Sequence, residues 1–137
     1  MKKIHHISLV TNDVELTLKT FNLTKFDIKE TYVDALQKNR LYFIYFEQND
    51  LWFEIVEPID KNSTTYNFAQ KMGLGLHHLG IATDNLELTE KEYTGRPFVY
   101  KIGNYTNNVK SFGGEISTVF VAIKGLILEF VANVKKK

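Results

Sequence analysis

Hydrophobic and polar residues alternate along several short stretches of the chain, and this alternation predicts strands. Residues 4–10 form the first such stretch, with His6 and Ser8 on one face and Ile7 on the other. The polar run at 11–13 ends the strand and caps a short helix whose apolar residues recur at helical spacing. We expect that helix to cover the face that carries Ile7, which leaves His6 and Ser8 on the opposite face.

The rest of the first half predicts three more strands. Residues 25–33 read as an irregular strand, whereas 40–46 and 51–56 are rich in aromatic and β-branched residues. The turn residues at 48–50 join the latter two into a hairpin. Glu54 lies within an otherwise apolar strand, and a buried ionised carboxylate requires a cation, a metal or a raised pKa.

The second half repeats the order of elements in the first. Residues 59–74 read as a connector with a short helix at 64–72. The elements that follow are a strand at 75–83, a helix that ends near Tyr93, a strand at 98–102, a polar loop at 103–114, a strand at 115–123 and a last strand after the turn at 124–125. Each half is therefore βαβββ. We expect an α+β fold in which two modules, residues 1–58 and 75–133, share one curved mixed sheet around a cleft.

Composition restricts the possible partners and ligands. The 137 residues suffice for one domain, and 44% hydrophobic residues are too many for a disordered chain. A net charge of +1 predicts no nucleic-acid partner, and the lysines at 135–137 read as a solvated tail. The sequence has no cysteine, so any metal must be held by histidine and carboxylate. No signal peptide or membrane span is recognisable, so we expect a cytoplasmic protein without a membrane partner.

Two His-His pairs and two strand glutamates occupy matching positions in the two halves. His6 corresponds to His78, and Glu54 corresponds to Glu129. Two modules related by a pseudo-twofold axis bring equivalent positions together, so these four side chains are expected to converge in the cleft. Two imidazoles and two carboxylates suit Ni, Co, Fe, Mn or Zn.

The neighbouring positions suggest which other side chains belong to this site. Alternation places Ser8, Gly80 and Ala82 on the faces of the proposed ligands, where small residues leave room for a bound molecule. By the same alternation His5 and His77 point the other way, and we expect both to pack or hydrogen-bond beneath the helices. The alternative is a register slipped by one residue, which would make His5 and His77 the ligands.

These segments resemble the vicinal oxygen chelate superfamily, which includes glyoxalase I, methylmalonyl-CoA epimerase, extradiol dioxygenases, and bleomycin and fosfomycin resistance proteins. The segments that carry the resemblance lie at 4–7, 53–58 running through 63–68, 75–79 and 125–129. The resemblance implies the glyoxalase/bleomycin resistance fold over residues 1–137, a homodimer and a divalent metal. The implied metal ligands are His6, Glu54, His78 and Glu129. Glutamate at 54 is similar to bacterial glyoxalase I, whereas the connector and the two His-His pairs are more similar to the epimerases.

The resemblance also implies several activities. The first is a glyoxalase I-like lyase or isomerase that enolises a small carbonyl or thioester substrate, such as a thiol conjugate, with Glu54 or Glu129 as the base. The alternatives are a methylmalonyl-CoA epimerase-like acyl-CoA epimerase, an Fe(II) extradiol-type dioxygenase that leaves Glu54 without a role, and a non-catalytic binding or resistance protein. No acidic residue in the strand at 40–46 matches the additional base expected of an epimerase.

Three further residues are candidates for substrate binding. Arg40 and Arg96 each open a predicted strand at the corresponding place in their halves, where a guanidinium can anchor a carboxylate or phosphate. Exposed surface charge is the alternative interpretation for both arginines. Ser8 is the third candidate, because it shares a face with His6.

Overall fold

The computed structural model describes residues 3–133, and the lysines at 135–137 lie outside this range. Within it the chain forms three α-helices and eight strands. The chain divides into two compact units: Ile7–His77, called the first unit, and residues 3–6 with 78–133, called the second unit. Strands β1 (Lys3–Thr11) and β5 (Leu74–Ala82) each contribute residues to both units. The predicted module boundaries at 58 and 75 remain a prediction.

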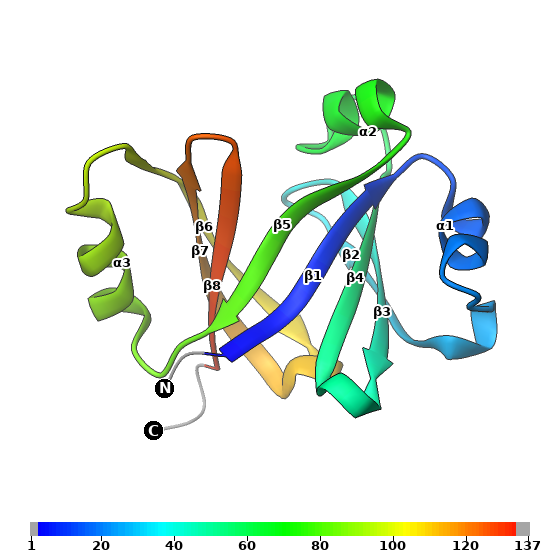
Figure 1. Ribbon diagram of the computed structural model, residues 1–137, viewed down its shortest axis with the longest axis horizontal. Helices are drawn as coiled ribbons and strands as arrows, with labels where there is room; N and C mark the ends of the chain where they lie inside the picture. Colours follow the sequence, from blue (N-terminus) through cyan, green and yellow to red (C-terminus); the bar gives the residue numbers. More distant parts are fainter. Residues whose placement is uncertain (1–2, 134–137) are drawn as a thin grey trace. The chain divides into compact units, whose positions relative to one another are not determined.

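The first unit contains the predicted hairpin and the first helix. Its strands β2 (Ile28–Asp34), β3 (Asn39–Phe46) and β4 (Leu51–Pro58) pair antiparallel, and the spatial order is β2-β3-β4-β1 (Figure 1). Helix α1 (Val14–Thr20) begins after Asp13, whose carboxylate accepts a hydrogen bond from the Leu16 amide at 3.0 Å. Leu18 of α1 packs with Ile44 and Ile55 in a buried cluster. The helix therefore covers the face of β3 and β4 that carries Ile44 and Ile55, and its predicted cover of Ile7 remains a prediction.

Two local structures shape the remainder of the first unit. The predicted strand at 25–33 begins only at Ile28, because Lys25–Asp27 (η1) forms a 3-10 turn that Thr24 and Asp27 cap reciprocally. A second 3-10 turn, η2 (Glu47–Asn49), joins β3 to β4. The predicted connector contains α2 (Tyr66–Met72), which is shorter than the predicted helix at 64–72. Buried hydroxyls before α2 bond to Asn39, the closest being Ser63 Oγ at 2.5 Å from Asn39 Oδ1.

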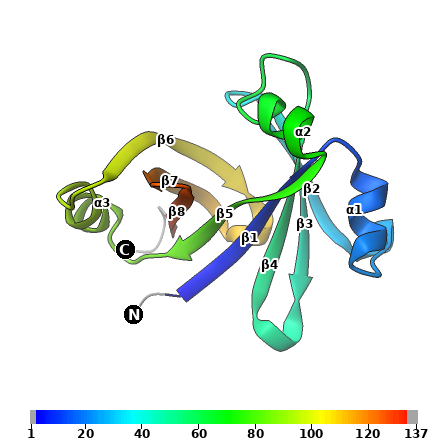
Figure 2. The same ribbon diagram turned by 45° about the horizontal axis from the view of Figure 1, so that its top comes forward.

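The second unit contains β6 (Val99–Val109), β7 (Gly114–Ile123) and β8 (Leu126–Asn133), in the order β5-β8-β7-β6 (Figure 2). The β5–β8 pair is parallel and the β6–β7 and β7–β8 pairs are antiparallel, so the sheet is mixed, as expected. Helix α3 (Leu86–Thr94) begins at Asn85, whose side chain accepts from the Leu88 amide at 2.9 Å. Leu86 and Tyr93 pack on the buried cluster made of Val119, Val121, Leu128 and Phe130. Helix α3 thus covers one face of β7 and β8. The residues that alternate with this cluster, such as Phe120 and Glu129, lie on the opposite face of the two strands.

The prediction of a polar loop at 103–114 is wrong, because strand β6 continues to Val109. Residues from Gly103, opposite Phe120, to Val109, opposite Gly114, pair with β7. Exposed polar residues at 104, 106 and 108 alternate there with less exposed ones. As the last strand in the spatial order, β6 pairs on one side only, and polar residues are common on such edge strands. Only η3 (Lys110–Phe112) and the adjoining glycines turn the chain into β7.

Candidate metal centre

Three of the four predicted metal ligands meet in the second unit. His6 lies on β1, His78 on β5 and Glu129 on β8. Glu129 Oε1 is 2.8 Å from His6 Nε2 and 3.1 Å from His78 Nε2, and the two Nε2 atoms are 3.3 Å apart. All three side chains are buried. The three potential ligand atoms therefore converge on one point, and the three residues are called the His-His-Glu cluster below.

Close packing fixes the rings of this cluster. Gly80 lies two residues after His78 on β5, and a Cβ atom built on Gly80 would stand 2.0 Å from Cε1 of His6. The glycine is therefore required by the position of the His6 ring. The ring of Phe120 contacts the ring of His78 edge-on, with 5.1 Å between centroids, and the ring of Phe112 stacks on His6 at 5.8 Å. Gly80 was predicted only as a small residue that leaves room for a ligand.

The electrostatics of Glu129 suit a cationic ligand. Burial raises the pKa of the Glu129 carboxyl, but the hydrogen bonds and charges of His6 and His78 outweigh burial and hold that pKa well below its usual range. The carboxylate is therefore ionised at neutral pH. A metal ion that replaces the shared protons would be held by one carboxylate oxygen and by the two Nε2 atoms that face the same point. Two nitrogen donors and one oxygen donor fit the borderline divalent metals expected from the sequence.

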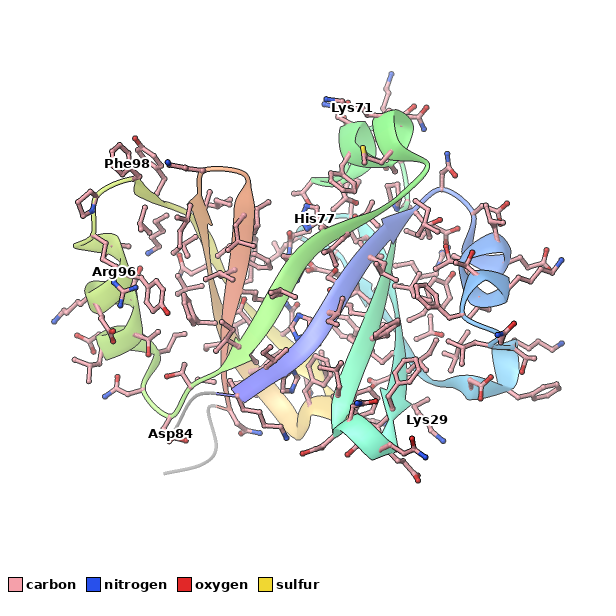
Figure 3. All side chains as sticks on the ribbon, in the orientation of Figure 1. Lys29, Lys71, His77, Asp84, Arg96 and Phe98 are labelled. Atoms are coloured by element: carbon pink, nitrogen blue, oxygen red, sulfur yellow. The ribbon has the colours of Figure 1, made fainter. Side chains whose placement is uncertain are left out.

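His5 lies beside the cluster, so the prediction that it packs beneath a helix is wrong. The Nδ1 atoms of His5 and His6 are 2.9 Å apart, and the His5 ring meets Phe112 edge-on at 4.4 Å. These two contacts direct the His5 ring, which lies near the exposed start of β1, toward the His-His-Glu cluster. His77, labelled in Figure 3, instead contacts Phe68 of α2 at 5.1 Å, as predicted. The two His-His pairs therefore differ in the role of their first histidine.

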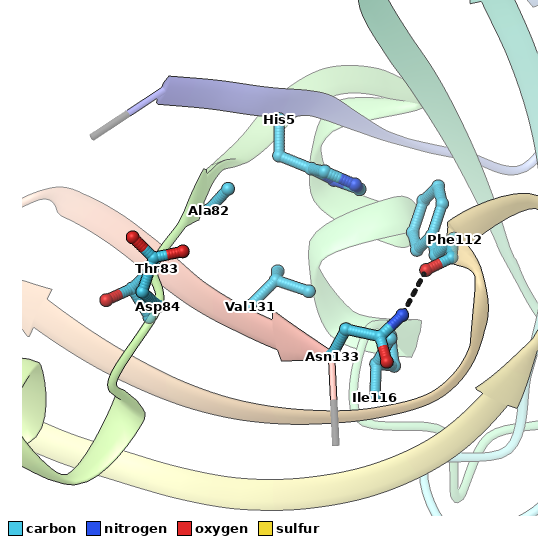
Figure 4. A pocket seen from close by; sticks show the side chains of 8 residues that line it. All are labelled: His5, Ala82, Thr83, Asp84, Phe112, Ile116, Val131 and Asn133. Carbon is cyan, nitrogen blue, oxygen red and sulfur yellow. Dashed lines mark hydrogen bonds between the residues drawn. The ribbon is translucent and has the colours of Figure 1, made fainter. Parts of the chain in front are cut away.

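A cavity of about 270 Å³ adjoins the cluster within the second unit (Figure 4). Two of its wall residues, Ala82 and Val131, lie two positions after Gly80 and Glu129 on the same strands. Asn133 Nδ2 donates a hydrogen bond to the carbonyl oxygen of Phe112 at 3.3 Å, which ties the turn at Phe112 to β8. The lining residues are His5, Ala82, Thr83, Asp84, Phe112, Ile116, Val131 and Asn133. Sequence reasoning missed Phe112 and Asn133, because nothing in the pattern marks the turn as part of a site.

The other two predicted residues of the centre, Ser8 and Glu54, lie in the first unit. Glu54 is buried on β4, and Ser8 Oγ donates a hydrogen bond to Glu54 Oε1 at 3.1 Å. This contact agrees with the prediction that Ser8 lies on the face of the proposed ligands. Their roles toward a metal or a substrate remain predictions.

Both arginines that were predicted to bind substrate form local ion pairs. Arg40 lies 3.4 Å from Glu57, which also accepts a hydrogen bond from the Tyr42 hydroxyl at 3.0 Å. Arg96, labelled in Figure 3, pairs with Glu92 of α3 at 2.8 Å. Each positive charge thus has a carboxylate beside it, and the substrate-binding role of the arginines remains a prediction.

Comparisons with known proteins agree with the fold. Three similar solved structures are methylmalonyl-CoA epimerases. A variant of the Streptomyces coelicolor enzyme in complex with 2-nitronate-propionyl-CoA has 18% identity and a TM-score of 0.77 over 97% of this chain and 95% of that one. An epimerase in complex with methylmalonyl-CoA and NH4+ has 19% identity and a TM-score of 0.78 over 98% and 96%. The Mycobacterium tuberculosis epimerase has 16% identity and a TM-score of 0.73 over 97% and 89%.

Among the described residues, no helix has the length and apolar character needed to cross a membrane.

Two further comparisons concern the sequence. No curated protein matches the chain. Residues 5–100 match the family model described as the glyoxalase/bleomycin resistance protein/dioxygenase superfamily. Since this match spans more than half of the sequence, the chain belongs to that superfamily, as its resemblance to the vicinal oxygen chelate proteins predicts.

Proposed function

We propose that this protein is a metal-dependent enzyme that enolises a small carbonyl or thioester substrate. The observation that carries the proposal is the convergence of His6, His78 and Glu129, all buried, beside a cavity of about 270 Å³. A buried set of two imidazoles and one ionised carboxylate matches metal sites with open positions for substrate oxygens. A divalent cation held there would stabilise negative charge on an enolate oxygen and so make the neighbouring carbon acid easier to deprotonate.

Acyl-CoA epimerisation is the activity that we favour within this class. Solved epimerases with CoA ligands are similar to nearly the whole chain, although identities below 20% support the fold and not the substrate. Epimerisation needs only removal of a proton next to the thioester carbonyl and its return to the opposite face. Glyoxalase I-like isomerisation of a thiol conjugate is the second candidate, favoured by glutamate at position 54.

Glu54 is proposed as the fourth ligand and as a candidate base. The sequence supports this assignment, because Glu54 occupies in β4 the position that Glu129 occupies in β8. Glu54 is buried and accepts a hydrogen bond from Ser8, which would orient its carboxylate. A carboxylate that holds the substrate proton only transiently suits enolisation. Glu129, held ionised by two histidines, is assigned to ligation first and to proton transfer second.

Two activities from other classes share some of these features. Two histidines and one carboxylate are also the facial donor set of Fe(II) oxygenases, so extradiol-type chemistry is a competing proposal. A non-catalytic binding protein would retain the cavity but needs no complete ligand set. We also propose a homodimer in the cytoplasm without nucleic-acid or membrane partners, and light scattering of the purified protein tests its oligomeric state.

The proposed function is tested by metal analysis and solvent exchange. The purified protein is analysed for bound metal and incubated in D2O with methylmalonyl-CoA or with the hemithioacetal of methylglyoxal, and deuterium incorporation is followed by NMR. Incorporation next to the thioester supports epimerisation, and incorporation only with the hemithioacetal supports glyoxalase-like isomerisation. Bound metal without exchange, accompanied by oxygen uptake with catechols, would support the dioxygenase. Absence of metal binding in both the natural protein and His78→Ala would overturn the metal-centre proposal.

A further inference from the structure

Two side chains separate the cavity of the second unit from the His-His-Glu cluster. The eight described residues that line the cavity include none of the three cluster residues. They do include His5 and Phe112, and both contact the ring of His6. The Nδ1 atoms of His5 and His6 are 2.9 Å apart, and the Phe112 ring stacks on the His6 ring with 5.8 Å between centroids. The rings of His5 and Phe112 therefore form a wall, called the aromatic wall below, between the cavity and the cluster.

The side chains of the cluster are between 1% and 8% exposed, so a metal ion reaches them only when a neighbouring side chain moves. Phe112 lies on the turn η3, and the two glycines that follow, Gly113 and Gly114, have φ angles of +89° and +107°. By contrast Phe120, the ring that contacts His78, lies within β7, which is paired with a strand on each side. Local opening of a turn costs less free energy than opening of a central strand. Of these two barriers, the aromatic wall therefore opens more easily.

The charge and the size of the cavity suit a hydrated cation. Asp84 is exposed and is the one acidic residue among the described residues that line the cavity, which include neither lysine nor arginine. Its carboxylate attracts cations and repels anionic substrates over roughly 10 Å at 0.1 M salt. Figure 4 shows Thr83 and Asp84 on one side of the cavity and Phe112 on the other. Because the volume of about 270 Å³ is several times the roughly 30 Å³ of one water molecule, an ion fits together with bound water.

We propose that this cavity is the route by which the metal enters and leaves the cluster. A hydrated divalent cation collects beside Asp84, passes the aromatic wall when the Phe112 side chain rotates, and is then bound by the cluster. The inference rests on the metal centre of the proposed function and assigns further residues to its loading. A route changes the rates of binding and release but not the affinity, because the free and bound end states stay the same. Substitutions along the route should therefore change both rate constants by the same factor.

Ala82→Leu tests the route, because Ala82 lines the cavity and a leucine there would fill part of it. Association of Co²⁺ with the metal-free protein is followed by stopped-flow absorbance, and release is followed after addition of EDTA. Both rate constants are expected to fall by at least about 5-fold while the Kd stays the same. Ile116→Phe fills the same cavity from β7 and should have the same effect. Phe112→Ala removes part of the aromatic wall and should raise both rate constants.

Asp84→Asn tests the attraction of the cation. It is expected to slow Co²⁺ association about 2- to 10-fold at low salt and to have no effect at 1 M salt, where charges are screened beyond about 3 Å. Glu15→Gln is the charge-matched control, because Glu15 is an exposed residue of α1 in the first unit and does not line the cavity. An equal effect of the two variants would contradict the role assigned to Asp84.

Ala122→Leu is the matched control for the filled cavity. Ala122 lies on β7 two residues after Phe120, whereas the lining residue Ile116 lies four residues before it. This variant should leave both Co²⁺ rate constants unchanged. Unchanged rates in both Ala82→Leu and Ile116→Phe would overturn the route, and so would slowing by Ala122→Leu alone, which indicates entry from the other side of Phe120. Failure of the natural protein to bind Co²⁺ would instead overturn the metal centre of the proposed function.

Discussion

Gly80 and His6 are in such close contact that no side chain fits between them. The Cβ atom of an alanine at position 80 would lie 2.0 Å from Cε1 and 2.1 Å from Nδ1 of the His6 ring. Both distances are far below a normal contact, so one of the two residues must move. Since the His6 ring is stacked on Phe112 and bonded to Glu129, its displacement would change the cluster itself.

Gly80→Ala is therefore expected to weaken metal binding. Overpacking of a buried site costs roughly 1–3 kcal/mol of stability, and a displaced ligand is expected to lower metal affinity by at least about 10-fold. Co²⁺ titration and thermal unfolding measure the two effects. Gly125→Ala is the matched control, because a Cβ atom there meets nothing within 4 Å. Equal Co²⁺ affinities in the two variants would show that the cluster does not hold the metal.

Metal removal is expected to destabilise the protein. A metal that binds only the folded state adds about 2.7 kcal/mol when its free concentration is 100 times its Kd. Chelation should therefore lower the Tm, and addition of Zn²⁺ or Co²⁺ should restore it. His78→Ala should abolish this metal dependence, whereas His77→Ala, on the ring that packs against Phe68, should retain it. A metal-dependent Tm in His78→Ala would contradict the ligand assignment.

His5 is expected to support His6 as a ligand. Because the Nδ1 atoms of the two rings are 2.9 Å apart, His5 fixes the orientation of the ring whose Nε2 faces Glu129. Loss of such an outer partner typically lowers metal affinity by roughly 10-fold or more. His5→Gln should show this loss in Co²⁺ titrations, and His77→Gln provides the equivalent change in the other His-His pair. An unchanged affinity in His5→Gln would mean that packing against Phe112 alone orients His6.

Tyr42 is expected to make the protein sensitive to alkaline pH. Burial raises the pKa of the Tyr42 phenol above 10.0, and its hydrogen bond to Glu57 adds to the effect. A pKa raised by folding means that the neutral phenol stabilises the native state below pH 10 and that this contribution is lost as the pH rises through the folded-state pKa. Tyr42→Phe should therefore flatten the decline of Tm above pH 10.

Absorbance at the phenolate band checks that Tyr42 itself titrates in that range. Tyr45→Phe is the comparison: a hydrogen bond to Asp50 raises the pKa of the Tyr45 phenol, but this hydrogen bond is exposed to water, which screens its charge. The Tyr45 variant should change the alkaline decline less than Tyr42→Phe does. A larger effect of Tyr45→Phe would contradict the role assigned to Tyr42 burial.

The repeated pattern in the sequence was sufficient to predict most of the fold and the convergence of His6, His78 and Glu129. Glu54 and Glu129 were recognisable as candidate ligands because burial of an ionised carboxylate in an apolar strand costs free energy. The two His-His pairs at matching positions indicated His6 and His78. Strand alternation selected the second histidine of each pair, and the geometry of His6 and His78 is consistent with that choice.

The remaining features depend on neighbours that are distant in the sequence. Asn104 and Asn108 read as loop residues, because the pairing of β6 with β7 is not visible in local composition. His5 departs from alternation because Phe112 and the His6 ring attract it, and Phe112 lies more than 100 residues away in the chain. An unpartnered hydroxyl such as that of Thr118 is recognisable only when all of its neighbours are known.

The spatial order β5-β8-β7-β6 has a consequence for synthesis of the protein. Strand β8 emerges from the ribosome after β6 and β7, yet it lies between β5 and β7 and carries Glu129. Strand β8 therefore has to insert between β5 and β7 after both strands have been synthesised, and such long-range pairing is slow. A nascent chain that ends before β8 has both histidines but lacks Glu129. The complete His-His-Glu cluster is therefore expected to form, and to bind a metal, only after β8 has been synthesised and inserted.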